Sequence, residues 1–217
     1  MTPEEIAAYL QRHPEFFEDY ADMVASIYIP HPHGGRAISI NERQMLTLRE
    51  KGKLLESKLH DLIRYGEEND AIGEKLHRLA LALVTARDAT ETMQALYFNL
   101  HEDFAIPHVA LRLWRNAAAA DSVECQPVSD EMREFAVELA QPQCGGEARP
   151  DVTEWFNVPE ATLKSFAYIP LRDADTFGLL VLASEDPQRF YPEMGTLYLK
   201  RLGDLTAGAL GHRLDRA

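Results

Sequence analysis

Two histidines lie close together in IPHPHGGRAISINERQ (residues 29–44), directly before a long helical pattern. A His-x-His pair such as His31 and His33 can bind a transition metal, but a working site needs a third and commonly a fourth ligand. The residues immediately around the pair supply no carboxylate or cysteine to complete such a set, so we predict no metal site within one chain. Whether the histidine pairs of two chains could hold a metal together stays open.

The same segment contains two prolines and two glycines, at positions 30, 32, 34 and 35. A glycine pair before a helix can hold an anion on its backbone N–H groups, but the G-x-x-x-x-G-K-[ST] spacing of a phosphate loop is absent. Proline and glycine both interrupt regular structure. We therefore interpret the segment as a joint between two parts of the chain.

No set of residues is typical of a catalytic site. Ser165 and Ser184 do not stand in a G-x-S-x-G sequence. Asp173 and Asp175 fall in a predicted turn, where solvation by water explains two acidic residues without a reaction. We therefore predict that the protein is not an enzyme.

A binding site for a small molecule is better supported. An arginine and a tryptophan share one face of a predicted strand at 107–115, and two aromatic residues share one face of another at 165–171, because side chains alternate along a strand. An arginine beside aromatic rings suits a planar or anionic ligand through stacking and paired hydrogen bonds. The candidate ligand-binding residues are Arg112, Trp114, Trp155, Phe166 and Tyr168. The alternative is that the arginine only faces solvent and the rings only fill the core.

The composition describes an ordinary globular protein, with 46% hydrophobic residues among 217 and a net charge of −13. A surface of that sign repels phosphate backbones and anionic lipids, which disfavours general nucleic-acid or membrane binding. No apolar run approaches the ~20 residues needed to cross a bilayer, and no basic, apolar leader is present, so we expect a cytoplasmic protein. Cys125 and Cys144 lack metal-binding spacing and are expected to be free thiols.

Residues 1–38 are predicted to form a helical hairpin. Thr2 and Glu5 make a capping box for a first helix, and Pro14 ends this helix and starts a second. The second helix is expected to carry Phe16, Phe17, Tyr20 and Met23. The hairpin resembles a DNA-binding helix-turn-helix in outline only, because residues 1–40 contain two strongly basic residues.

Residues 39–87 are predicted to form one long helix that pairs with a second copy. Apolar residues recur at spacings of three and four, as in a coiled coil, with one extra three-residue step after Asn69. At ~1.5 Å per residue such a helix is roughly 65 Å long, more than one small domain can cover. The predicted interface residues are Met45, Leu48, Leu55, Leu59, Leu62, Asn69 and Leu76. The direction of pairing stays open, as does an antiparallel helical pair within one chain.

Residues 88–217 change to a mixed pattern. Asp88 and Glu91 cap a helix that ends before Pro107, and residues 141–151 are expected to be irregular. The other predicted elements are strands at 107–115, 165–171 and 177–184, a possible strand at 121–128, and helices at 130–140 and 192–212. The fold class is therefore α+β, with one antiparallel sheet, helices packed on one face, and the opposite face free for a ligand.

The segment GLLVLASEDPQRFYPEMGTLYLKRLGDLTAGAL resembles a GAF domain, with a strand from Gly178 to Ser184 and a polar turn containing Asp186 and Phe190. YLQRHPEFF, IPHPHGG, ERQ, LREK and this tail, in that order, resemble the bacterial family called domain of unknown function 484. The resemblance implies a helical N-terminus, a coiled coil and a GAF-like domain, without an established activity. GAF domains broadly bind small molecules or mediate dimerisation. The signatures of the cyclic-nucleotide-binding and bilin-binding members are absent.

The sequence thus predicts a homodimeric sensor or regulatory protein, whose GAF-like domain binds a small molecule and signals through the coiled coil. Two alternatives stay open. One is a protein-interaction adaptor with an empty GAF-like domain and a partner on the N-terminal hairpin, and the less favoured one is an enzyme of unknown reaction. The sequence identifies neither a ligand or cofactor nor a downstream partner.

Overall fold

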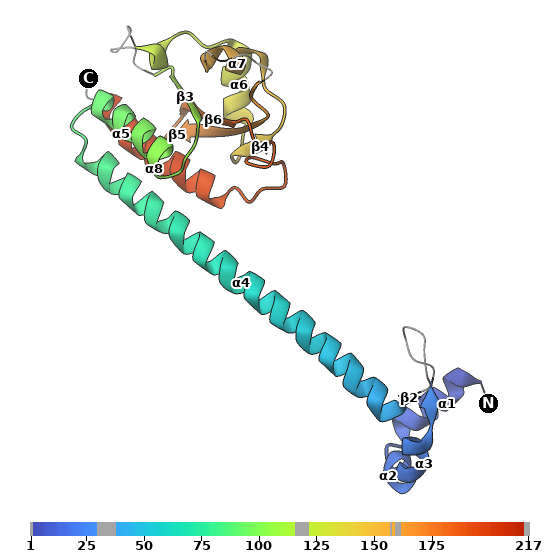
Figure 1. The fold of residues 1–217 in the computed structure, drawn as a ribbon. Helices are drawn as coiled ribbons and strands as arrows, with labels where there is room; N and C mark the ends of the chain where they lie inside the picture. Colours follow the sequence, from blue (N-terminus) through green and yellow to red (C-terminus); the bar gives the residue numbers. More distant parts are fainter. Residues whose placement is uncertain (1, 30–37, 116–121, 157, 159–161, 215–217) are drawn as a thin grey trace. The chain divides into compact units, whose positions relative to one another are not determined.

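The computed structural model describes residues 2–29, 38–115, 122–156, 158 and 162–214. It contains two compact units, Met1–Glu68 and Asn69–Ala217, so the second unit begins within the long helix rather than at the predicted boundary of 88 (Figure 1). The histidine pair His31 and His33 lies outside the described residues. None of the described helices is long and apolar enough to cross a membrane.

The first unit begins with short helices and a short strand pair. These elements are α1 (Pro3–Arg12), α2 (Glu15–Asp19), α3 (Ala21–Ser26), β1 (Tyr28–Ile29) and β2 (Ile38–Ser39). The predicted capping box is confirmed, since the Thr2 hydroxyl accepts from the backbone N–H of Glu5 and the Glu5 carboxylate accepts from the N–H of Thr2. The prediction of one second helix was wrong, because the backbone leaves helical geometry at Tyr20, which separates α2 from α3.

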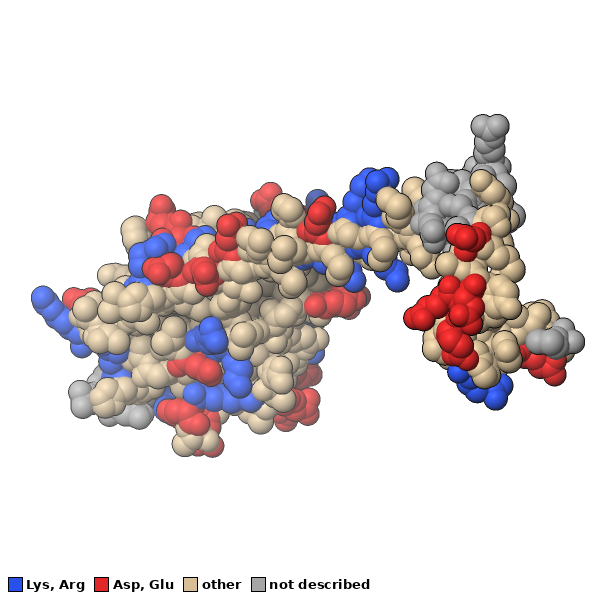
Figure 2. Space-filling model, turned by 90° about the horizontal axis from the view of Figure 1, so that it is seen from below, with Lys and Arg blue, Asp and Glu red and all other residues tan. Residues whose placement is uncertain are grey.

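Helices α1 to α3 have an acidic and apolar surface. No residue of α1 or α2 is buried, and Tyr9, Phe17, Tyr20 and Met23 are each close to half exposed. Acidic side chains occupy the first turns of all three helices, and Figure 2 shows them gathered on this unit. Apolar side chains this exposed need a covering partner to be stabilised by burial.

Helix α4 (Ile40–Thr85) is one continuous helix of 46 residues, as the proline-free pattern predicts. It begins at Ile40, directly after the short strand β2. Five of the predicted interface residues have more than half of their surface exposed: Met45, Leu48, Leu55, Leu59 and Leu62. Asn69 is also exposed.

The second unit is built on a four-stranded antiparallel sheet in the order β3-β6-β5-β4. Its strands are β3 (His108–Leu113), β4 (Gln143–Gly145), β5 (Ser165–Arg172) and β6 (Thr176–Ser184). Its helices are α5 (Ala89–Glu102), the 3-10 helix η2 (Val123–Cys125), α6 (Asp130–Glu138), α7 (Pro150–Trp155) and α8 (Leu197–Leu214). The predicted hairpin is confirmed by the pairing of β5 with β6. Asp88 caps α5 by accepting from the N–H of Glu91, as predicted.

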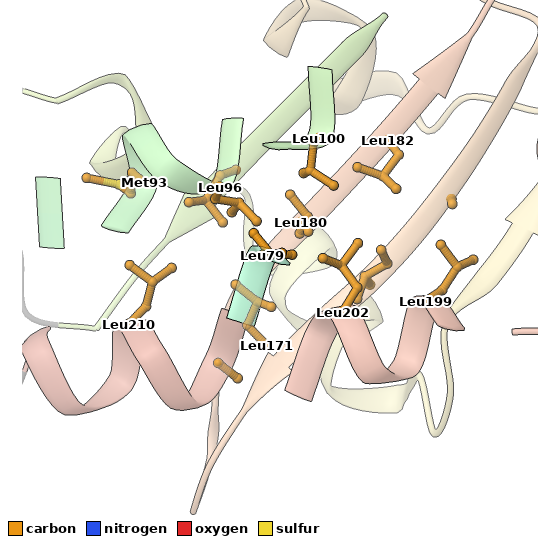
Figure 3. Close-up of a cluster of buried hydrophobic side chains, with 14 of the residues drawn as sticks. Leu79, Met93, Leu96, Leu100, Leu171, Leu180, Leu182, Leu199, Leu202 and Leu210 are labelled. Atoms are coloured by element: carbon orange, nitrogen blue, oxygen red, sulfur yellow. The ribbon is translucent and has the colours of Figure 1, made fainter. Parts of the chain in front are cut away.

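Helices cover both faces of this sheet, whereas the sequence predicted one. Alternate side chains of β3, β5 and β6 pack under α5, α8 and the end of α4 (Figure 3), where Leu96, Leu180 and Leu202 are buried. The other side chains of these strands pack under α6 and α7, where Phe166, Leu179 and Val181 are buried. Both strand faces are apolar because both are covered.

Leu76 was wrongly predicted to lie in the dimer interface. It is 6% exposed and packs in the core of its own chain, together with Leu79 and Leu83. The three-residue step after Asn69 is therefore the point at which one apolar row of α4 turns towards the sheet. Apolar periodicity identifies a buried face but does not say whether its own chain or a partner covers it.

Three further elements differ from the prediction. The possible strand at 121–128 contains the 3-10 helix η2, and α8 begins at Leu197 rather than at residue 192. Residues 141–151 were expected to be irregular, but they contain β4 and the start of α7. Strand β4 is three residues long, which is too short for side-chain alternation to reveal it.

Candidate ligand-binding site

Arg112 lies on the sheet face under α6 and α7, as its alternation along β3 predicts. The residue is 5% exposed, and its guanidinium carbon is 4.8 Å from the ring centre of Trp155, at the end of α7. Its Nη1 donates to the backbone oxygen of Leu111 at 3.0 Å. A cation held against an indole face is electrostatically favourable, especially away from water. The structure thus brings two of the predicted site residues into direct contact.

A tyrosine and a carboxylate near Arg112 influence its pKa. The hydroxyl of Tyr97 on α5 donates to Glu124 of η2 at 3.1 Å. Burial lowers the pKa of Arg112, and electrostatic interactions with Tyr97 and Glu124 act in the opposite direction. Burial, followed by Glu124, raises the pKa of Tyr97, so the phenol keeps its proton. Arg112 remains a cation, because its ordinary pKa is far above neutral pH.

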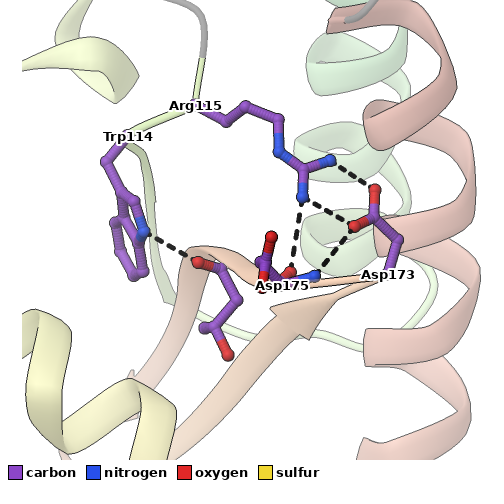
Figure 4. A network of polar contacts seen from close by, with 5 residues as sticks. Trp114, Arg115, Asp173 and Asp175 are labelled. Carbon is purple, nitrogen blue, oxygen red and sulfur yellow. Dashed lines mark hydrogen bonds and ion pairs between the residues drawn. The ribbon is translucent and has the colours of Figure 1, made fainter.

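Trp114 and Arg115 fasten the end of β3 to the turn between β5 and β6 (Figure 4). The Trp114 indole N–H donates to the Thr176 carbonyl at 2.9 Å, and both terminal nitrogens of Arg115 donate to the Asp173 carboxylate. This ion pair holds the pKa of Asp173 well below its usual range. The interpretation that Asp173 is only solvated by water was therefore wrong.

Phe166 and Tyr168 share one face of β5 and are 1% and 4% exposed. The Tyr168 hydroxyl accepts from the backbone N–H of Arg149 at 3.1 Å and donates to the backbone oxygen of Glu147 at 3.3 Å. Burial raises the pKa of Tyr168, so its hydroxyl stays protonated and can donate. Tyr168 thereby fixes the segment between β4 and α7 against the sheet.

That segment and the edge strand β4 border a cavity of about 610 Å³. Tyr168 is shared between this cavity and the predicted site. The exposed guanidinium of Arg149 stacks on Phe135 of α6, 3.5 Å from the ring centre, and Phe135 meets Tyr168 edge to face. The lining consists of Phe135, residues 143–150, Tyr168 and Pro192. The cavity therefore presents an accessible cation beside two aromatic rings.

The candidate ligand-binding residues predicted from the sequence did not include Arg149 and Phe135. Arg149 lies in the segment that was expected to be irregular, and Phe135 was assigned only to a helix. The signal available for Arg149 was the pair Arg149-Pro150, since proline favours the first turn of a helix and Pro150 begins α7.

Cys144 also lines the cavity, but its sulfur is a weak nucleophile. The residue is 7% exposed, and burial raises the pKa of its thiol to about 11. The thiolate is the reactive form of cysteine, so the protonated thiol behaves as a small apolar group at neutral pH. Among the described residues, no three His, Cys, Asp or Glu side chains are grouped in a way that could hold a metal ion.

The second unit has the fold of a GAF domain. It is similar to the GAF domain of a phosphoenolpyruvate-protein phosphotransferase (ptsP) from Coxiella burnetii, with a TM-score of 0.53 and 12% identity over 67% of this chain and 95% of that one. A free methionine-R-sulfoxide reductase from Neisseria meningitidis, solved with its substrate, gives a TM-score of 0.49 and 15% identity over 67% and 92% of the two chains.

The chain belongs to the family described as "Protein of unknown function, DUF484", whose model matches residues 1–214. It is also similar to the uncharacterized protein YigA of Salmonella typhimurium strain LT2, with 25% identity over 205 residues, which cover 91% of this chain and 86% of that protein. The family that the sequence motifs indicate is thereby confirmed, together with the GAF-like fold.

Proposed function

We propose that the protein is a cytoplasmic, non-enzymatic homodimeric regulator whose GAF-like domain binds a small planar or anionic molecule. The observation that carries the proposal is the cavity beside β4, where Arg149 and two aromatic rings converge. Its volume of about 610 Å³ lies within the ~300–1,000 Å³ typical of ligand pockets. The GAF-like fold supports a regulatory or sensor role.

The ligand enters at the Tyr168 end of the predicted site. Arg149 supplies the cation for an anionic group, because it is exposed and already oriented by its stacking on Phe135. Arg112 and Trp155 lie on the same sheet face towards the opposite edge strand β3, and Trp114 and Phe166 complete this layer. A ligand that moves α7 would change the environment of Arg112, whose partner Trp155 ends that helix.

The signal passes through a pair of α4 helices. A helix of 46 residues is roughly 70 Å long, and its apolar residues from Met45 to Leu62 lie in water in a single chain. A second copy offers the same apolar row and is the simplest cover for it. The raised pKa of the Cys144 thiol supports a binding role for the cavity rather than nucleophilic catalysis.

Native mass spectrometry of the purified protein, compared with its denatured mass, tests the proposed ligand and the proposed dimer together. We expect a dimer that carries additional non-covalent mass. The variant Arg149→Gln should lose that mass, and the control Arg201→Gln, which removes an exposed arginine stacked on Tyr198, should keep it. A monomer without additional mass would contradict the proposal.

The exposed apolar residues of α1 to α3 favour a second function, that of a protein-interaction adaptor. In this case the acidic and apolar surface of α1 to α3 is the binding surface, and the GAF-like domain carries no ligand. The same mass spectrum separates the two functions, because the adaptor predicts a dimer of unmodified mass for the wild type and for Arg149→Gln alike.

A further inference from the structure

An apolar groove of about 380 Å³ lies between the end of α4 and α8. Val84 lines it and has 77% of its surface exposed, more than any other large hydrophobic residue in the described part of the chain. The remaining lining residues are Ala80, Leu83, Asp204, Leu205, Gly208, Ala209 and Arg213. A groove with this lining would be stabilised by an apolar partner surface.

The groove is firmly built. Arg213 of α8 donates to two backbone oxygens. One belongs to Leu83, in the last turn of α4, and the other to Ala86, the residue directly after this helix. These bonds hold α8 alongside the end of α4, as Figure 1 shows. A Cβ atom added at Gly208 would meet no atom from outside its own stretch of α8 within 4 Å, so the groove is open at this position.

The groove continues a row of residues on α4. Ala80 belongs to a series with intervals of seven residues, and Val84 follows one turn later. The series consists of Met45, Gly52, Leu59, Gly66, Gly73 and Ala80. The neighbouring row, with Leu76 and Leu83, turns into the core. Only the end of that row is therefore used within the chain, whereas Met45, Leu59 and Gly66 of the series above are exposed.

We propose that this groove packs against the same groove of a second copy, so that the two α4 helices run parallel. The inference rests on the proposed homodimer and adds its direction and a second contact surface. In a dimer with a two-fold axis along parallel helices, each patch meets its own copy, so Val84 lies beside the partner's Val84. In an antiparallel pair the two grooves would lie at opposite ends of the paired helices and could not contact each other.

The charges on α4 fit the parallel arrangement. In the heptad that begins at Met45, Lys51 occupies position g and Glu56 the following position e, and both side chains are exposed. Positions g and e of neighbouring heptads meet across a parallel pair, and opposite charges there favour that pairing. Each dimer would then contain two Lys51–Glu56 contacts between chains.

Cysteine cross-linking of the full-length protein measures the direction directly. Under mild oxidation, Val84→Cys should form a disulfide-linked dimer. The control Ala71→Cys places an exposed cysteine on another side of α4 and should stay unlinked, as should the wild type with Cys125 and Cys144. A disulfide that forms in a mixture of Met45→Cys and Val84→Cys chains, and in neither variant alone, would show an antiparallel pair and overturn the inference.

Gly208→Glu provides a second measurement. Glutamate is a better helix former than glycine, and its Cβ atom would meet no neighbouring side chain within 4 Å here, so the fold should persist, with unchanged or higher helix content by circular dichroism. Two carboxylates facing each other should weaken the dimer at least tenfold in analytical ultracentrifugation. If the variant dimerises as tightly as the wild type, the groove is not in the interface, although the dimer of α4 helices stands. A wild-type monomer would instead refute the proposed dimer itself.

Discussion

Gly203 of α8 is predicted to be a position where adding one methyl group destabilises the second unit. A Cβ atom at this residue would lie 2.7 Å from the Cγ2 of Ile169, which is fully buried on β5. Real Cβ atoms do not approach other carbons so closely, so α8 must shift or Ile169 must change its rotamer. Overpacking of this kind typically costs about 1–3 kcal/mol.

Gly208→Ala is the matched control on the same helix, because a Cβ there meets no atom of its own chain within 4 Å. Both variants gain about 1 kcal/mol of helix propensity. This gain cancels in the comparison, so the difference in unfolding free energy between them, measured where both variants have the same oligomeric state, reports the close contact at Gly203. We expect Gly208→Ala to be the more stable by about 1–3 kcal/mol, and each kcal/mol corresponds to roughly 2–4 °C in Tm at this chain length.

Urea and thermal unfolding followed by circular dichroism give these values. All variants must be compared at one protein concentration, because the stability of a dimer depends on it. The double variant Gly203→Ala with Ile169→Leu removes the Cγ2 atom and should recover part of the loss relative to Ile169→Leu alone. Equal stability of Gly203→Ala and Gly208→Ala would refute the packing of α8 on β5 described above.

Three further outcomes can be measured. The pKa of Asp173 is lowered by its pair with Arg115, so this pair stabilises the fold at pH values above the usual aspartate pKa of about 3.9. The stabilisation is lost as the pH falls. The Tm of Asp173→Asn should therefore drop less between pH 5 and pH 3 than the Tm of the wild type. With its pKa raised to about 11, Cys144 should react with Ellman's reagent at pH 8 at least ~100-fold more slowly than a free thiol, and at the ordinary rate once urea unfolds the protein. Arg213→Gln, which loses charged hydrogen bonds to carbonyl groups at the end of α4, should lower the unfolding free energy by about 2 kcal/mol in urea titrations, and Arg213→Lys should lose less.

The sequence alone determined the elements whose signals are local. The Thr2 and Asp88 caps satisfy backbone groups within a few residues, so their partners can be identified from spacing. The alternation along β3, β5 and β6 predicted which side chains share a face, and the proline-free heptad pattern predicted α4. These features depend on the geometry of one helix or one strand.

Tertiary structure decided which surface covers each apolar face and which arginine is accessible. Leu48 and Leu76 belong to the same apolar pattern of α4, yet Leu48 is exposed, whereas Leu76 is buried because the end of the helix packs in the core of the second unit. Arg112 was predicted at a ligand site from its strand position, but Trp155, from a distant helix, covers it, while Arg149 lies open beside the cavity. Burial depends on residues far apart in the sequence, and periodicity within one segment contains no information about them.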